Sequence, residues 1–243
     1  MVSAKSFLLA ALAAGTYASP CKSLTPTLPG TGTTSLPAPA PTELFRRIAI
    51  GHGIQNYSCE SSTSTPVQLG ALAALYDVTP LYPGTPRTGL SKAAFDALPI
   101  TTLYGQSIPL NLVDPTVNYN AVVGNPWVAP ADLVLGGLPT IKFLGHHFFE
   151  IDNTPMFDLT AAGLKASVAR NDSAAAPATA DKGILGTGAV PWLQLTESNK
   201  NRSNGLNLVY RVVTAGGVAQ SCLTTGAGVG SVPYTTFYWF YAA

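Results

Sequence analysis

The stretch VPYTTFYWFYA, residues 232–242, decides the fold class of this 243-residue chain. In an extended backbone, side chains alternate between two faces. Here both faces are aromatic, with one set on even and one on odd positions: Tyr234, Tyr238 and Phe240, then Phe237, Trp239 and Tyr241. Apolar residues on both faces are typical of a strand that is covered on both sides. We therefore expect a central, buried strand at this end of the chain.

The preceding segments extend the same period-two pattern. Residues 206–213 alternate with one face more apolar, and a turn at 214–217 predicts a short returning strand at 218–222. Further strands are expected at 46–50, 54–59, 141–151, 163–170 and 189–196, and short helices at 66–76 and 91–98. Residues 101–140 contain five prolines and are expected to be an irregular insertion. The pattern predicts an all-β domain, an antiparallel sandwich or flattened barrel.

The N-terminus has the features of a secretory signal peptide over residues 1–18. Lys5 precedes an eight-residue apolar run at 7–14, and Thr-Tyr-Ala at 16–18 supplies a cleavage site. The run is too short to span a bilayer, so we expect an exported protein with no membrane insertion after cleavage. Residues 19–42 are rich in Pro, Thr and Ser and are expected to be a disordered tether. A single β domain should then occupy residues 43–243.

The charge balance excludes several partners. Charged residues are only 10% of the chain, and removal of Lys5 leaves equal numbers of basic and acidic residues. Nucleic-acid binding would need a basic stripe, and an anionic membrane surface would need a basic amphipathic helix; neither is present. We expect the partner to be a glycan, a cell-wall component or a small molecule.

Three cysteines remain after signal cleavage. We favour a Cys59–Cys222 disulfide with Cys21 in the tether, and Cys21–Cys59 is the alternative pairing. An extracellular location also permits N-glycosylation. Three sequons are present, at Asn171, Asn201 and, within an expected strand, Asn56.

The run GHHFFEID, residues 145–152, holds the candidate catalytic residues His146, His147, Glu150 and Asp152. In a strand, the Cα atoms of His146 and Glu150 lie about 13 Å apart, so we expect no metal site. Glu150 and Asp152 share a face about 6.6 Å apart, a separation that suits proton transfer. We favour the alternative that both carboxylates are simply solvated.

Three other residues are candidates for ligand binding. His52, flanked by glycines, is either a site residue or, as we favour, a residue of a β-bulge. Arg211 lies amid apolar neighbours and should find a carboxylate or carbonyls, and we favour a structural ion pair. Trp127 would form a sugar-stacking platform with Tyr119 and Trp192, although we expect Trp192 in the core.

Signatures of common enzyme classes are missing. There is no Gly-x-Ser-x-Gly, no Walker loop, and no Gly-x-Gly-x-x-Gly between a strand and a helix. The glycine-rich segments 183–188 and 226–230 are typical of turns. We expect no cofactor.

Six motifs in order give the chain a resemblance to a known family: IQNYSC at 54–59, GALAALYD at 70–77, GHHF at 145–148, AVPWL at 189–193, YRVVTAGG at 210–217 and PYTTFYWFY at 233–241. The chain resembles a family of secreted fungal proteins with bacterial relatives and no established function. The resemblance implies the Cys59–Cys222 bridge and assigns no catalytic residues. Fungal members are often labelled malate dehydrogenase.

The sequence thus predicts a secreted β protein that binds a ligand or cell-wall component. The alternative is an extracellular enzyme with its site near residues 146–152, covered by the 101–140 insertion. A malate dehydrogenase comes last, because the strand–loop–helix element that holds a dinucleotide pyrophosphate is missing.

Overall fold

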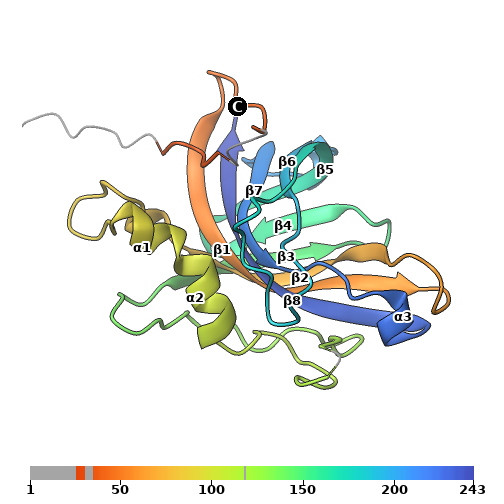
Figure 1. The fold of residues 1–243 in the computed structure, drawn as a ribbon. Coiled ribbons are helices and arrows are strands. Elements are labelled where there is room, and N and C mark those ends of the chain that lie inside the picture. The colour runs from red at the N-terminus through yellow and green to blue at the C-terminus, as the bar shows by residue number, and fades with distance from the viewer. Residues whose placement is uncertain (1–25, 31–34, 118) are drawn as a thin grey trace, which may run out of the picture.

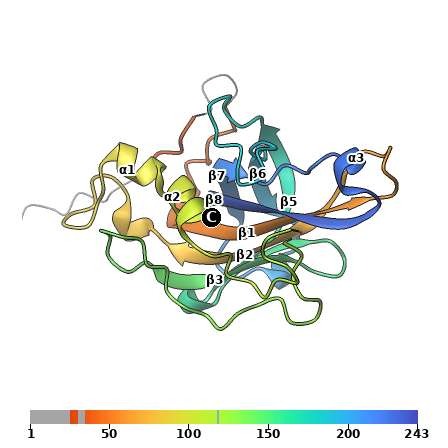
Figure 2. The same ribbon diagram turned by 60° about the horizontal axis from the view of Figure 1, so that its bottom comes forward.

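The computed structural model describes residues 26–30, 35–117 and 119–243, and within them eight antiparallel strands form a closed barrel (Figures 1 and 2). Each strand pairs with the next in the chain, and β8 closes the ring against β1. The strands are β1 (Leu44–Cys59), β2 (Val67–Asp77), β3 (Lys142–Phe149), β4 (Pro155–Leu159), β5 (Leu164–Ala174), β6 (Trp192–Glu197), β7 (Leu208–Gly216) and β8 (Gly228–Ala242). The helices are α1 (Lys92–Asp96), α2 (Leu98–Gly105) and α3 (Cys222–Thr225), with 3-10 turns at Thr79–Leu81, Thr160–Ala162 and Lys200–Arg202.

The barrel interior holds one hydrophobic core. Tyr238 and Phe240 of β8 pack there with Phe157 of β4 and with apolar side chains from every other strand. Residues drawn from all eight strands can meet only inside the ring, so this cluster fills the barrel. The even-numbered aromatics of β8 therefore face inward.

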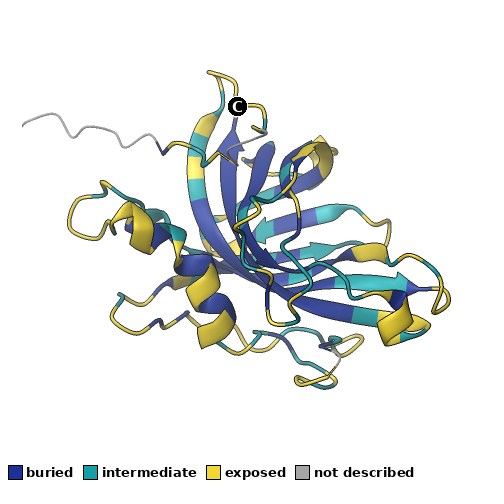
Figure 3. Cartoon of the chain, in the orientation of Figure 1, coloured by how far each residue is buried: buried dark blue, intermediate teal, exposed yellow. Residues whose placement is uncertain are grey.

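A second core covers the outer face of β1 and β8. Phe237 and Trp239 of β8 pack with Phe95 of α1 and Leu98 of α2, and with apolar residues of the N-terminal segment such as Leu36. The rings of Phe95 and Phe237 are stacked, with centroids 4.7 Å apart. Figure 3 shows the consequence: β8 and the middle of β1 are buried on both sides, whereas much of β5 is exposed. This confirms the all-β fold and the doubly covered C-terminal strand.

The Cys59–Cys222 disulfide is present, joining the end of β1 to α3. Residues 1–25, with the expected signal peptide and Cys21, lie outside the described residues. The described part of the expected tether contacts the barrel, where the Tyr210 hydroxyl donates a 2.7 Å hydrogen bond to the carbonyl of Pro37. Among the described residues, no helix is long and apolar enough to cross a membrane.

Several predicted elements differ from the structure. The helix expected at 66–76 is strand β2, because its small Ala and Gly residues pair with β1 and β3 on either side, and this pairing overrides the helical preference of Ala and Leu. The prediction of a strand at 218–222 is wrong. That segment leads instead into α3, whose first turn is capped by the Ser221 hydroxyl accepting from the backbone N–H of Leu223.

Other predictions are refined. The two strands expected at 46–50 and 54–59 are one continuous β1, and the bulge expected at His52 is absent, since His52 pairs regularly with Ala74 and Thr235. The helix expected at 91–98 is α1, followed at once by α2. The irregular insertion expected at 101–140 begins within α2, and its described residues from 106 onward are irregular apart from isolated bridges such as Leu110 with Trp127. Asn171 and Asn201 are exposed, and Asn56 is partly buried.

Candidate ligand-binding site

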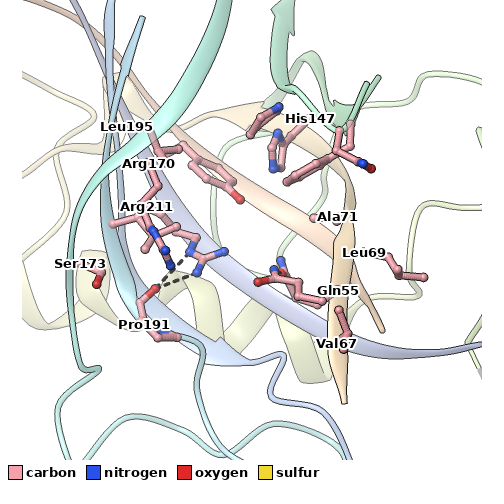
Figure 4. A pocket seen from close by; sticks show the side chains of 17 residues that line it. Gln55, Val67, Leu69, Ala71, His147, Arg170, Ser173, Pro191, Leu195 and Arg211 are labelled. Carbon is pink, nitrogen blue, oxygen red and sulfur yellow. Dashed lines mark hydrogen bonds between the residues drawn. The ribbon is translucent and has the colours of Figure 1, made fainter. Parts of the chain in front are cut away.

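A cavity of about 630 Å³ occupies the end of the barrel next to the β1–β2 and β3–β4 hairpins. Every strand contributes at least one lining residue, so the cavity continues the barrel interior above the packed core. Its volume is within the range of pockets that hold one small organic molecule. The lining residues are Gln55, Val67, Gln68, Leu69, Gly70, Ala71, His147, Phe149, Asn153, Pro155, Arg170, Ser173, Pro191, Leu193, Leu195, Arg211 and Tyr238 (Figure 4).

A glycine of β1 leaves room for the ring of Tyr238 in the cavity lining. A Cβ atom on Gly51 would lie 2.5 Å from the Tyr238 ring, so a larger residue there would displace the ring. The hydroxyls of Tyr234 and Tyr238 are hydrogen-bonded at 3.0 Å.

Arg211 of β7 is the buried charged group of the cavity wall. It is 6% exposed, and its Nε and Nη2 donate to the carbonyl of Pro191 at 3.1 and 2.9 Å. None of the ion pairs among the described residues includes Arg211. The prediction of a structural ion pair is therefore wrong, while the expected contact with a carbonyl is present. A guanidinium keeps its charge at all physiological pH values, so the cavity wall holds a buried cation without a counter-ion.

The charge of Arg211 influences the pKa values of nearby tyrosine hydroxyls. Burial raises the pKa of the Tyr238 hydroxyl, and Arg211 opposes that shift by its charge and by a hydrogen bond. Arg211 likewise opposes the burial-driven rise of pKa at Tyr234 and Tyr57. The Tyr238 hydroxyl is uncharged, so its hydrogen bond to the guanidinium does not neutralise the charge.

His147 of β3 faces the cavity with one nitrogen fixed. Its Nδ1 is 2.8 Å from the carbonyl of Met156, which only accepts, so Nδ1 carries the proton. Its ring stacks on Phe157 at 4.1 Å and 7°. Burial, reinforced by the charge of Arg211 and opposed by the bond to Met156, lowers the pKa of His147 to about 4. The neutral ring therefore has an unprotonated Nε2.

Gln55 of β1 supplies a third polar group. Its side chain is fully buried, and its Oε1 accepts a 2.7 Å hydrogen bond from Nε2 of Gln68. Its own Nε2 is buried and makes no well-aligned hydrogen bond among the described residues, although the Gln55 side chain interacts with the Tyr234 hydroxyl and opposes the burial-driven rise of its pKa. An acceptor on a bound ligand would satisfy this N–H group more fully.

The lining is electropositive. Arg211 is buried and Arg170 lies exposed at the opening, whereas none of the described lining residues is Asp or Glu. The remaining wall is largely aliphatic and aromatic, as at Leu193, Leu195 and Phe149.

The acidic candidates lie elsewhere, in the β3–β4 turn. Glu150 and Asp152, here called the acidic turn, both pair with Arg202 of the β6–β7 connection. The hydrogen bond from Arg202, 2.7 Å from the Asp152 carboxylate, is the main cause that lowers the pKa of Asp152 to about 2. Both carboxylates are thus paired with one cation, and Asp152 is held ionised, an arrangement that does not favour proton transfer.

The other candidates are dispersed. His146 lies on the opposite side of β3 from His147, with its ring centroid 4.0 Å from that of Trp127 in the insertion. His52 is 1% exposed and lies on the outer side of β1, since the neighbouring Gly51 faces Tyr238 inside. Trp192 is in the outer core, as expected. Of the sequence-predicted candidates, the structure brings only His147 and Arg211 to the cavity.

Sequence reasoning missed Gln55 and Tyr238 as site residues. A signal was available for Gln55, a polar residue at an inward position of an otherwise apolar stretch of β1. No group of three or more His, Cys, Asp or Glu side chains within the described residues is arranged to hold a metal ion.

Comparison with known proteins gives a family without an activity. No curated protein and no solved structure matches the chain. A family model matches residues 39–242, which include the whole barrel and every cavity residue named above. The chain therefore belongs to the family described as protein of unknown function DUF3455.

Proposed function

We propose that this protein is exported and binds one small organic acid in the mouth of the barrel. The observation that carries the proposal is the buried guanidinium of Arg211, which lines the cavity and has no carboxylate partner among the described residues. Burying a charge costs several kcal/mol unless a partner of opposite charge is supplied. A ligand carboxylate would supply that charge, and guanidinium and carboxylate have matching fork geometry.

The amount of charge favours a carboxylate over a phosphate. A phosphate monoester carries about −1.5 to −2 charges near neutral pH. The cavity offers one buried cation, Arg211, and the second, Arg170, is exposed at its opening. A singly charged carboxylate on Arg211 is neutralised in full.

The walls favour an organic body on the ligand. Leu69, Phe149, Leu193 and Leu195 provide apolar surface next to the polar groups. Burying such surface stabilises a complex by roughly 25 cal/mol per Å². The ligand that fits is therefore an amphipathic carboxylate small enough for about 630 Å³.

Export is supported by the signal-like N-terminus and by the disulfide, since disulfides persist in oxidising compartments. The expected test is secretion of the protein by a eukaryotic host, with a mature N-terminus near residue 19 by Edman sequencing. Retention of the intact N-terminus inside the cell would contradict export.

Calorimetry with benzoate and with straight-chain carboxylates of six to ten carbons tests the binding. We expect binding to the wild type, a loss of about 30-fold or more in Arg211→Gln, and no change in the matched variant Arg202→Gln. Circular dichroism establishes that both variants are folded. Equal binding by Arg211→Gln and the wild type, or no binding of any carboxylate, would contradict the proposal. If phenyl phosphate binds more tightly than benzoate, the ligand carries a phosphate and the proposal of a carboxylate is wrong.

A further inference from the structure

His147 presents a hydrogen-bond acceptor to the cavity. Its Nδ1–H is bound to the carbonyl of Met156, which leaves its Nε2 lone pair free of any hydrogen bond to the described residues. The imidazole is 4% exposed and lines the cavity, where Figure 4 shows it facing the same space as Gln55 and Arg211. Its Nε2 lone pair is thus available to a donor on a ligand in the cavity.

The ring is fixed in this orientation. It is stacked on Phe157 with an interplanar angle of 7°, and the rings of Phe149 and Tyr238 lie against it at 5.6 and 5.4 Å. Turning the ring over would leave the carbonyl of Met156 facing a carbon atom and would cost a buried hydrogen bond. Nε2 is therefore preorganised as an acceptor, and preorganised groups bind at low entropic cost.

Protonation of Nε2 would convert this acceptor into a donor, and the surroundings oppose it. Burial and the charge of Arg211 both lower the pKa of His147, which is about 4. The lining has no carboxylate to stabilise an imidazolium among its described residues.

Gln55 and Arg211 present the complementary chemistry. The Nε2 of Gln55 is a buried donor with no well-aligned acceptor among the described residues, and the guanidinium of Arg211 is a buried cationic donor. These two groups suit the oxygens of one carboxylate, which accept only. A carboxylate alone would make no hydrogen bond to Nε2 of His147.

We propose, resting on the proposed function, that the ligand is a hydroxy-substituted carboxylic acid, with its carboxylate on Arg211 and Gln55 and its hydroxyl donating to Nε2 of His147. A hydroxyl can donate to an imidazole nitrogen, whereas a hydrogen or methyl in its place covers the nitrogen without a hydrogen bond. A site built to hydrogen-bond a hydroxyl discriminates against the analogue that lacks it.

Matched ligand pairs test the proposal by calorimetry at pH 7. The probes are benzoate against the three hydroxybenzoates, and octanoate against its 2-, 3- and 8-hydroxy derivatives. For at least one position of the hydroxyl, we expect the wild type to bind the hydroxy acid about 3- to 10-fold more tightly than the parent acid. His147→Phe, which keeps an aromatic ring, should abolish that preference, whatever it does to the affinity for the parent acid. The neighbouring His146→Phe should leave the preference intact.

A second measurement does not depend on the folding of a variant. In wild-type protein labelled with ¹⁵N-histidine, the unprotonated Nε2 resonance of His147 should shift with the hydroxy acid and not with its parent. If carboxylates bind but the hydroxyl adds no affinity and no shift, this inference is wrong while the proposed function stands. If His147→Phe weakens both members of a pair equally, His147 has only a packing role. If no carboxylate of either series binds, the proposed function fails and this inference fails with it.

Discussion

Acidification should destabilise this barrel through two buried histidines. Burial lowers the pKa of His52 and of His147 to about 4, from 6.5 in the unfolded chain. Between these values the unfolded chain binds more protons than the folded one, so the free energy of unfolding falls as pH falls from about 6.5 to about 4. Above pH 6.5 neither histidine makes stability depend on pH.

The magnitude follows from the pH interval. At pH 5, about 1.5 units below the unfolded value, each histidine lowers the free energy of unfolding by about 2 kcal/mol, since one pKa unit is about 1.4 kcal/mol. The two sites together lower it by about 4 kcal/mol. Stabilities of 5–15 kcal/mol are typical for a domain, so this is a large fraction of the total.

Urea unfolding at pH 7 and pH 5 measures the effect. His52→Leu and His147→Phe should each halve the difference in unfolding free energy between the two pH values, whatever each does to stability at pH 7. His146, which is only half-buried, is the matched control: its pKa is also lowered by burial, but the nearby Asp158 opposes the shift. A wild-type stability at pH 5 within about 1 kcal/mol of that at pH 7 would refute the reasoning.

Three further predictions concern stability. Reduction of the Cys59–Cys222 disulfide, which spans 163 residues, should lower the free energy of unfolding by about 5 kcal/mol, measured by urea unfolding with and without reductant. Gly53→Ala should lower the free energy of unfolding by about 1–3 kcal/mol or prevent folding, because its Cβ would lie 1.9 Å from a carbonyl oxygen of β2. Gly136→Ala is the control, because the space around Gly136 is open. Equal thermal midpoints for the two variants would contradict this prediction. Arg202→Gln should leave the thermal midpoint nearly unchanged, because exposed ion pairs contribute little, and a large drop would assign the acidic turn a structural role.

The sequence predicts the fold wherever alternation and packing agree. The aromatic residues of β8 lie on two faces as expected, because both faces are covered by separate cores. It fails for β2, whose run of Ala and Leu has the composition of a helix. Those small residues suit the tight interior of a closed barrel, but closure depends on partners more than 60 residues away in β3 and beyond, which a local pattern does not report.

The site was predictable in part. His147 and Arg211 are unusual residues in strands, and that alone identifies them as candidates. Their convergence depends on the register of β3 against β7 around the ring, which local sequence does not encode. The pairing of the acidic turn with Arg202, 50 residues away, was invisible for the same reason, and it removes Glu150 and Asp152 from the candidate site.

The seam between the first and last strands has a consequence for biogenesis. β1 and β8 are the two longest strands and pair along their full lengths, from Leu44 with Ala242 to Cys59 with Gly228. During synthesis β1 emerges almost 170 residues before the last segment that it needs, so one of its edges stays unpaired for most of translation. Contacts of such sequence separation make folding slow, and open edges invite association with other chains. The barrel therefore cannot close until β8 has been synthesised. Export of an unfolded chain, followed by folding outside the cytoplasm, would fit this order of events.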